Sequence, residues 1–206
     1  MALAHKGLAA DYVAVNFTDK ETIAFSGQEK VPVLTDGAAT ISDSFAIACY
    51  LDDTYPDRPA LFGNTIARGE ARVINHWTNT VLHAAIQPLV IDDIYRHLNA
   101  ADQPYFMETR AGRFDRPFDQ VQANRDTEVV LLRNALAPLR LTLAEQPYLC
   151  GDAPAFADYI VFGAFQWARS ISPFKLFEES DPVRGWRDRL LVAFDRAGYA
   201  TNAYDA

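Results

Sequence analysis

The sequence predicts an α+β chain in which a small part containing strands precedes an all-helical part. Before the linker Pro56-Asp57-Arg58-Pro59, apolar residues tend to alternate, a pattern typical of strands; beyond it they recur with helical spacing. Pro56 should also end the helix that precedes the linker, because the residue before a proline disfavours the helical conformation. We therefore expect a domain boundary at this linker, with domains at residues 1–58 and 64–206.

The first part contains one strong local signal, a hairpin that leads directly into a helix. Asp36-Gly37 is a tight-turn pair between two β-type runs, and Asp43 or Ser44 can cap the helix that follows. Pro32 lacks an N–H group, so the strand edge that contains it should be unpaired. The expected elements are the end of a helix at residues 1–6, a strand at 11–17, an irregular helix and loop at 18–29, strands at 31–34 and 38–41, and a helix at 44–55.

The second part should be a helical bundle. Phe156 to Ile171 is apolar on nearly every side, which predicts a helix at the buried centre. Asp181 and Pro182 form the cap and first position of a last helix, which should end at Gly198. The remaining helices are expected at residues 66–98 and 128–145, with an irregular stretch at 99–125.

Composition excludes several classes of function. The net charge is −8 and the pI is near 4.9, which argues against nucleic acid or an anionic membrane as the main partner. The two cysteines, Cys49 and Cys150, have no Cys-x-x-Cys spacing, so a disulfide framework is not expected. We therefore expect the protein to lie in a reducing cytoplasm. No apolar run approaches the ~20 residues that a membrane span needs.

The sequence offers little for metal, nucleotide or hydrolase chemistry. The histidines His5, His76, His83 and His97 lack the spacing of metal ligands, so we expect packing or surface roles and no metal site. Glycine-rich dinucleotide loops, the Walker loop and the Gly-x-Ser-x-Gly elbow are missing from the sequence. For the hairpin and helix, an ordinary edge strand with an ordinary cap remains the alternative to a ligand site.

The order of these parts and their motifs resembles the glutathione S-transferases. The motifs are Lys30-Val31-Pro32-Val33-Leu34, Ile41-x-Asp43-Ser44-x-Ala46-Ile47-x-x-Tyr50-Leu51-Asp52, Leu149-Cys150-Gly151-Asp152 and Phe156-Ala157-Asp158-Tyr159. Within that superfamily, Asn16-Phe17-Thr18, Trp167 and Asp181-Pro182-x-x-x-Trp186 are most similar to the bacterial glutathione-dependent β-aryl-etherases and their fungal relatives.

The resemblance implies a thioredoxin-like N-terminal domain, an all-α C-terminal domain and a homodimer. It implies a cis Val31–Pro32 bond, with the Val31 backbone paired to glutathione like an added strand. It further implies that Asp43 and Ser44 hold the γ-glutamyl end, with Lys30 within reach of the glycyl carboxylate. Glutathione would be the cofactor, and a small-molecule electrophile the other partner.

Two departures from the family pattern bear on activity. The family's thiol-activating residue lies at the start of its first helix, and Met1 falls inside that helix, so we expect the first strand and that residue to be absent from this sequence. The catalytic residue is therefore unknown. At the apolar helix the usual Ser or Thr cap is Ala155, so only the return bond from Asp158 should form, and Asp158 is interpreted as structural.

These observations leave three hypotheses. The first is a glutathione transferase that conjugates the thiolate to an electrophilic, aromatic acceptor, with aryl-ether cleavage as one form; Trp77, Trp167 and Phe165 are candidates to line the acceptor pocket or to belong to the core. The second is a non-catalytic glutathione-transferase-like binding or regulatory protein. The third is an ordinary enzyme whose sequence begins late.

Overall fold

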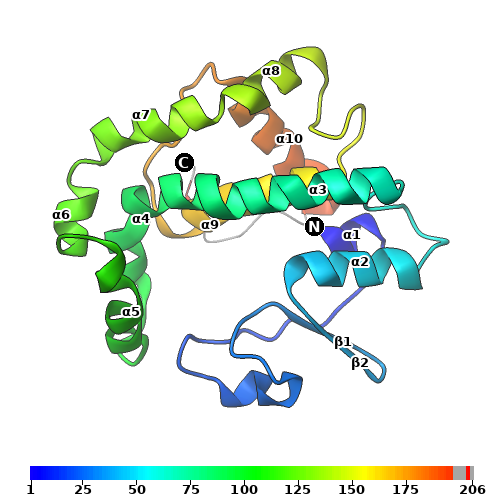
Figure 1. Cartoon of the computed structure of the whole chain (residues 1–206), viewed down its shortest axis with the longest axis horizontal. Helices are drawn as coiled ribbons and strands as arrows, with labels where there is room; N and C mark the ends of the chain where they lie inside the picture. The colour runs from blue at the N-terminus through cyan, green and yellow to red at the C-terminus, as the bar shows by residue number, and fades with distance from the viewer. Residues whose placement is uncertain (197–202, 205–206) are drawn as a thin grey trace.

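The computed structural model describes residues 1–196 and 203–204, and it has a small hairpin-containing part below a larger helical part (Figure 1). The only sheet in this described portion has two strands, and the rest of the regular structure is helical. The elements of the first part are α1 (Ala2–His5), the 3₁₀ helix η1 (Glu21–Ser26), β1 (Val33–Asp36), β2 (Ala39–Ser42) and α2 (Ser44–Thr54).

The helical part follows the predicted order with more subdivisions. Its elements are α3 (Thr65–Trp77), the π-helical segment η2 (Thr78–Leu82), α4 (His83–His97), α5 (Asp102–Arg110), the 3₁₀ helix η3 (Ala111–Arg113), α6 (Phe118–Gln122), α7 (Arg125–Ala135), α8 (Ala137–Glu145), α9 (Phe156–Ile171) and α10 (Pro182–Arg196). The predicted end of the last helix at Gly198 lies outside the described residues. Within the described ranges, no helix is both long and apolar enough to cross a membrane.

The hairpin forms where predicted, with its turn shifted by one residue. Asp36 pairs with Ala39, so the two-residue turn is Gly37-Ala38, and Asp36 belongs to β1. Gly37 has φ +58°, which suits the first central position of a type II′ turn, where glycine is favoured. The expected α+β class, with strands in the first part and an all-helical second part, is confirmed.

The strand predicted at residues 11–17 is wrong. Within the described residues β1 pairs only with β2, and no strand lies beside residues 11–17 to accept their backbone groups. The β-forming side chains there are consequently exposed, with Tyr12 at 84% and Val13 at 75%. A strand is stable only with a neighbour, which local composition does not reveal.

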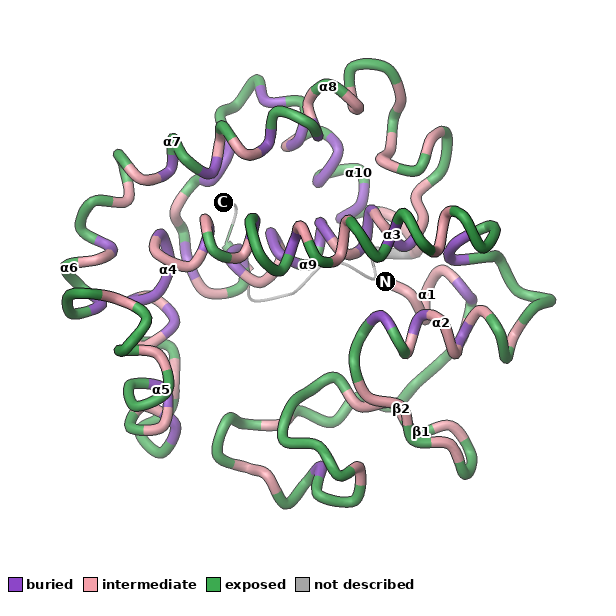
Figure 2. The backbone as a smooth tube through the Cα atoms, in the orientation of Figure 1, coloured by how far each residue is buried: buried purple, intermediate pink, exposed green. Residues whose placement is uncertain are grey.

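The core joins the two parts. Phe45 of α2 lies against Phe62 and Phe156, with ring centroids 5.4 and 5.7 Å away. Buried segments concentrate in α4 and α9, while most of the chain before α2 is exposed (Figure 2). The predicted central helix is thus the buried one, and the proposed division into domains 1–58 and 64–206 stays a prediction.

Helix caps and one carboxylate fix the position of α9. The Asp158 side chain is fully buried, and one of its oxygens accepts the return bond from the Ala155 N–H at 3.1 Å, as expected. The other oxygen accepts the Leu149 N–H at 2.7 Å and the Trp186 indole N–H at 2.8 Å. Asp158 therefore holds α9, the preceding turn and α10 together, which agrees with a structural role.

Candidate functional site

A large cavity lies between the hairpin part and the helical part, with a volume of about 1450 Å³. Its lining comes from residues 1–3, the stretch at residues 10–17, the segment at 31–34, one face of α2, and the facing surfaces of α3, η2, α4, α5, η3 and α9. A cavity that is mostly apolar with a few polar groups is the usual form of a small-molecule site. It is the candidate functional site.

The predicted proline segment forms one edge of the cavity. The Val31–Pro32 bond is cis, as the resemblance implied, and both residues line the cavity. In the described chain β1 has a hydrogen-bonded neighbour on one side only, so its other backbone edge is open. An open edge can accept an extended peptide as an added strand.

Asp43 and Ser44 lie beside this edge because a backbone bond holds them there. The Asp43 N–H donates to the Pro32 carbonyl at 3.3 Å. Asp43 has φ +77°, a conformation uncommon for a non-glycine residue and concentrated at functional sites. Its carboxylate caps α2 by accepting the N–H groups of Phe45 and Ala46 at 2.9 and 3.0 Å.

This capping changes what each residue can offer a ligand. Asp43 satisfies two of the free N–H groups at the start of α2, and it is not among the residues that line the cavity. The exposed Ser44 does line the cavity, so its hydroxyl and N–H are the available donors at this helix start. Lys30 is exposed and also outside the cavity lining. The structure therefore brings Val31, Pro32 and Ser44 together at the cavity, whereas Lys30 and Asp43 are outside its lining.

The stretch at residues 10–17 covers one side of the cavity and is fastened at its end. The carboxylate of Asp102, on α5, accepts both the N–H and the hydroxyl of Thr18, at 2.8 and 2.7 Å. The bond from the Thr18 hydroxyl is the largest influence on the pKa of Asp102 and lowers it. Burial raises this pKa, but the two Thr18 bonds outweigh burial, so the net pKa is lowered. Phe17 packs beside Phe106 and under the Arg110 guanidinium, with a centroid distance of 5.2 Å for the second contact.

The helical wall opposite the hairpin contains aromatic and small residues. Trp167 of α9 lines the cavity, and the His83 ring meets it edge-on with centroids 5.5 Å apart. Gly163 also lines the cavity, and a Cβ atom placed there would meet nothing within 4 Å. Of the other aromatic candidates, Phe165 is buried in the core against Phe177, and Trp77 is half-buried outside the lining.

The other reactive groups near the cavity are poorly suited to activate a thiol. The Tyr159 hydroxyl contacts His5 Nδ1 at 2.6 Å, and burial raises the pKa of Tyr159 while it lowers that of His5. Burial and the neighbouring Asp158 carboxylate raise the pKa of Cys150 to about 12. Burial also raises the pKa of Cys49, and neither thiol lines the cavity.

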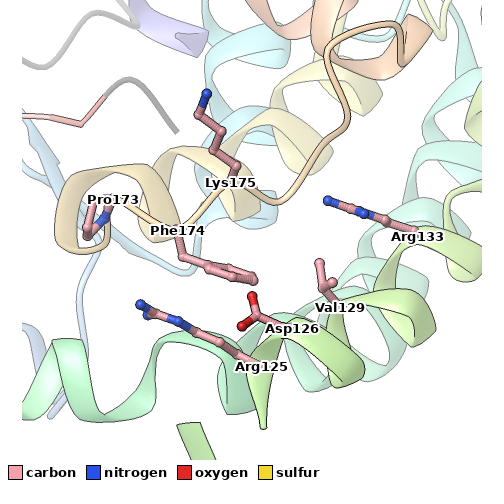
Figure 3. Close-up of a pocket in the computed structure, with 7 residues that line it drawn as sticks. All are labelled: Arg125, Asp126, Val129, Arg133, Pro173, Phe174 and Lys175. Carbon is pink, nitrogen blue, oxygen red and sulfur yellow. The ribbon is translucent and has the colours of Figure 1, made fainter. Parts of the chain in front are cut away.

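A second, smaller pocket lies between α7 and residues 173–175 (Figure 3). Its volume is about 410 Å³, and three of its lining residues, Arg125, Arg133 and Lys175, are cationic. Arg125 is paired with Asp93 at 3.0 Å, and Arg133 with Glu178 at 2.7 Å. With these pairs and the lining residue Asp126, its charges are balanced, so we assign it no function. Among the described residues no cluster of His, Cys, Asp and Glu is placed to hold a metal ion.

Comparison with known proteins shows which family this chain belongs to. Residues 71–194 match the family described as the glutathione S-transferase C-terminal domain, and residues 1–59 match the glutathione S-transferase N-terminal domain. The chain belongs to the glutathione S-transferase family. The chain is 34% identical over 103 residues to glutathione S-transferase Z2 of Arabidopsis thaliana, a match that covers 48% of this chain and 44% of the relative.

Solved structures show the same fold. A glutathione transferase of Phanerochaete chrysosporium, GSTFuA3, superposes with a TM-score of 0.80 at 23% identity, covering 91% of this chain and 85% of that one. A glutathione S-transferase of Ceriporiopsis subvermispora, solved in complex with glutathione, superposes with a TM-score of 0.82 at 21% identity over 100% of this chain and 89% of that one. The chain spans only 40–44% of the length of the first curated relatives it matches.

Sequence reasoning missed the polar residues of the helical wall. Asn75, Asn79, His83 and Gln87 all line the cavity, and in the sequence they stand four positions apart. That spacing marks a polar stripe on an otherwise apolar helix and was the available signal. Whether a stripe faces solvent or a cavity depends on how the helices pack, which the spacing alone does not determine.

Proposed function

We propose that this chain binds glutathione at the hairpin and the start of α2, and conjugates its thiolate to an electrophilic, aromatic acceptor held in the adjoining cavity. The proposal rests on one observation above all. The open edge at Val31-Pro32 and the donors of Ser44 border the same cavity whose other wall carries Trp167. Peptide and acceptor would thus be held side by side.

The two ends of the site suit the two ends of the peptide. The main chain of Val31 can pair with the extended cysteinyl unit as a strand would. The Ser44 hydroxyl and N–H, at the positive end of α2, suit the γ-glutamyl carboxylate. Asp43, although its oxygen caps the helix, keeps a negative charge near the position expected for the γ-glutamyl ammonium.

In the conjugation step the thiolate sulfur forms a C–S bond to the acceptor, and the leaving group departs with the electron pair of the broken bond. The contribution of the residues described above is orientation, because they fix the peptide backbone relative to the cavity. We leave the residue that stabilises the thiolate unassigned. Aryl-ether cleavage is the narrower form of the proposal, carried over from the resemblance to β-aryl-etherases, and pairing of two copies remains a prediction.

Glutathione binding without turnover is the second candidate function. The observation that favours it is the chemistry of the described thiols and of Tyr159. The thiols have raised pKa values and lie outside the cavity lining, while the Tyr159 hydroxyl is engaged with His5 and has a raised pKa. Neither kind of group lowers the pKa of a bound thiol, which is the step that makes it nucleophilic near neutral pH.

Retention on immobilised glutathione tests the binding site. We expect the wild-type chain to be retained and Ser44→Ala to bind about 10-fold more weakly, since a hydrogen bond to a charged group is lost. The helix should survive, because Asp43 and not Ser44 provides the cap. Ser180→Ala, at an exposed serine outside the cavity, is the matched control. Equal retention of all three proteins would refute the assigned site.

Turnover separates the two candidate functions. A transferase should consume glutathione with a chlorodinitrobenzene faster than the uncatalysed reaction does. Retention on glutathione without any such acceleration would establish the binding protein, and absence of both would refute the proposal as a whole.

A further inference from the structure

The cavity carries a stripe of uncharged polar side chains on the helix that runs through α3, η2 and α4. Asn75, Asn79, His83 and Gln87 all line it. In the described part of the chain, none of these four side chains has a hydrogen-bond partner in the protein. Polar groups on a cavity wall that make no internal bonds are available to a ligand or to water.

The π-helical segment is what aligns this stripe. In an α-helix a turn takes 3.6 residues, so side chains four positions apart drift steadily around the axis. Thr78–Leu82 is π-helical, and its wider i→i+5 turn reverses the drift between Asn79 and His83. Short π segments inside α-helices occur frequently at functional sites. Here the segment keeps the polar stripe facing the cavity.

This wall has no formal charge. The charged side chains of the described lining are Asp11, Arg110 and Arg113, which belong to the covering stretch and to the α5–η3 region. Burial lowers the pKa of His83, so the imidazole is neutral near neutral pH. A neutral imidazole offers one nitrogen that donates and one that accepts.

An aromatic surface adjoins the imidazole. The His83 ring meets the ring of Trp167 edge-on at 5.5 Å, and both line the cavity beside Gly163. A flat ligand over Gly163 could lie against Trp167 with a substituent directed at His83. Aromatic rings favour such offset and edge-on contacts.

We propose that His83 recognises an oxygen atom of the acceptor, and that the acceptors are uncharged aromatic compounds bearing a carbonyl, ether or hydroxyl oxygen. The inference rests on the proposed function, because it names the acceptor class of the same cavity. His83 donates to or accepts from that oxygen, and Trp167 packs against the ring. Acceptors whose carboxylate or sulfonate would lie at this wall are disfavoured, because the cationic lining residues Arg110 and Arg113 belong to the α5–η3 region and the wall itself provides no cation.

Binding of a matched pair of probes tests this assignment without requiring turnover. α-Tetralone and tetralin share a bicyclic skeleton and differ by one carbonyl oxygen. By equilibrium dialysis without glutathione, we expect the wild-type chain to bind α-tetralone about 3- to 10-fold more tightly, the ratio for one neutral hydrogen bond. His83→Phe keeps a ring against Trp167 and should abolish the preference, whereas His83→Gln, which keeps a donor and an acceptor, should retain part of it.

The matched control is His76→Phe, at an exposed histidine outside the cavity lining, which should leave the preference unchanged. Equal loss of both probes in His83→Phe would indicate a steric role and overturn the inference. So would a wild-type chain that binds neither probe or binds both equally. Loss of retention on immobilised glutathione, measured separately, would instead refute the proposed function. The ratio of the two probe affinities could still be measured in that case.

Discussion

Replacing Lys6 with methionine should test how the N-terminal helix is held to the rest of the fold. The Lys6 side chain is 1% exposed, and its Nζ lies 2.7 Å from Asp52 Oδ1 and donates to the Tyr55 carbonyl at 3.0 Å. Asp52 also accepts the N–H groups of Leu61 and Phe62, at 2.8 and 3.2 Å. The pair thus joins α1, α2 and the linker.

The expected loss in free energy of unfolding follows from these contacts. Removing one partner of a buried ion pair costs about 3–5 kcal/mol, because the other charge is left uncompensated. Asp52 is 10% exposed and keeps two N–H donors, so Lys6→Met should lie at the lower end, about 3 kcal/mol. Adding Asp52→Asn removes the orphaned charge and should recover part of that loss.

The pH dependence of the free energy of unfolding provides a further test. Burial raises the pKa of Asp52, but the Leu61 N–H, Lys6 and the Phe62 N–H outweigh it, so the net pKa is lowered. A carboxylate with a lowered folded pKa stabilises above its unfolded value of about 3.9, and this contribution is lost as the pH falls from there toward the folded pKa. Lys6→Met starts from a lower free energy of unfolding, so its acid unfolding should begin at higher pH, although less stability is then left to lose at Asp52 because one cause of its lowered pKa is gone.

Urea denaturation at neutral pH, followed by circular dichroism, measures the free energy of unfolding. Acid titration of the same signal measures the pH at which unfolding begins. Lys175→Met, at an exposed lysine, is the control and should change the free energy of unfolding by less than about 0.5 kcal/mol. A loss below about 1 kcal/mol in Lys6→Met, or an unchanged acid transition, would refute the reasoning.

Three further substitutions should change the thermal unfolding midpoint, measured by calorimetry. Asp158→Ala leaves four buried or half-buried donors, among them the Trp186 indole, without their acceptor, and should destabilise by more than about 3 kcal/mol; a smaller loss would contradict its role in joining α9 to α10. Ala155→Ser restores a capping hydroxyl at an extended residue and should stabilise by about 1 kcal/mol, with Ala157→Ser inside the helix as the control expected to give no gain. Thr78→Val removes a buried hydroxyl that has no partner and should raise the midpoint by about 2–4 °C, whereas a decrease would reveal an unrecognised bond.

The features that sequence predicted well depend on neighbouring residues. Asp36-Gly37 indicated the hairpin, Asp43 the start of α2, and the apolar run from Phe156 the central helix, because turn, cap and burial signals lie within a few positions. The family resemblance supplied the cis bond at Pro32, which local signals alone would not have given.

The features that sequence missed depend on contacts between distant segments. Residues 11–17 have strand-forming side chains but no neighbouring strand in the described chain, and Thr18 is held by Asp102 on α5 instead. The π-helical segment at Thr78 has no local signature that periodicity detects. His83 was interpreted as a packing or surface residue, since only the packing of α4 beside α9 shows that it lines a cavity.

Gly163 makes the capacity of this cavity easy to change in evolution or by design. Each larger side chain at this position would occupy ligand space first, because a Cβ there meets no protein atom within 4 Å. Alanine inside a helix is also more stable than glycine by about 0.5–1 kcal/mol. A single nucleotide change to alanine could therefore reduce the free space in the cavity while it stabilises the fold, so glycine here exchanges some stability for cavity volume.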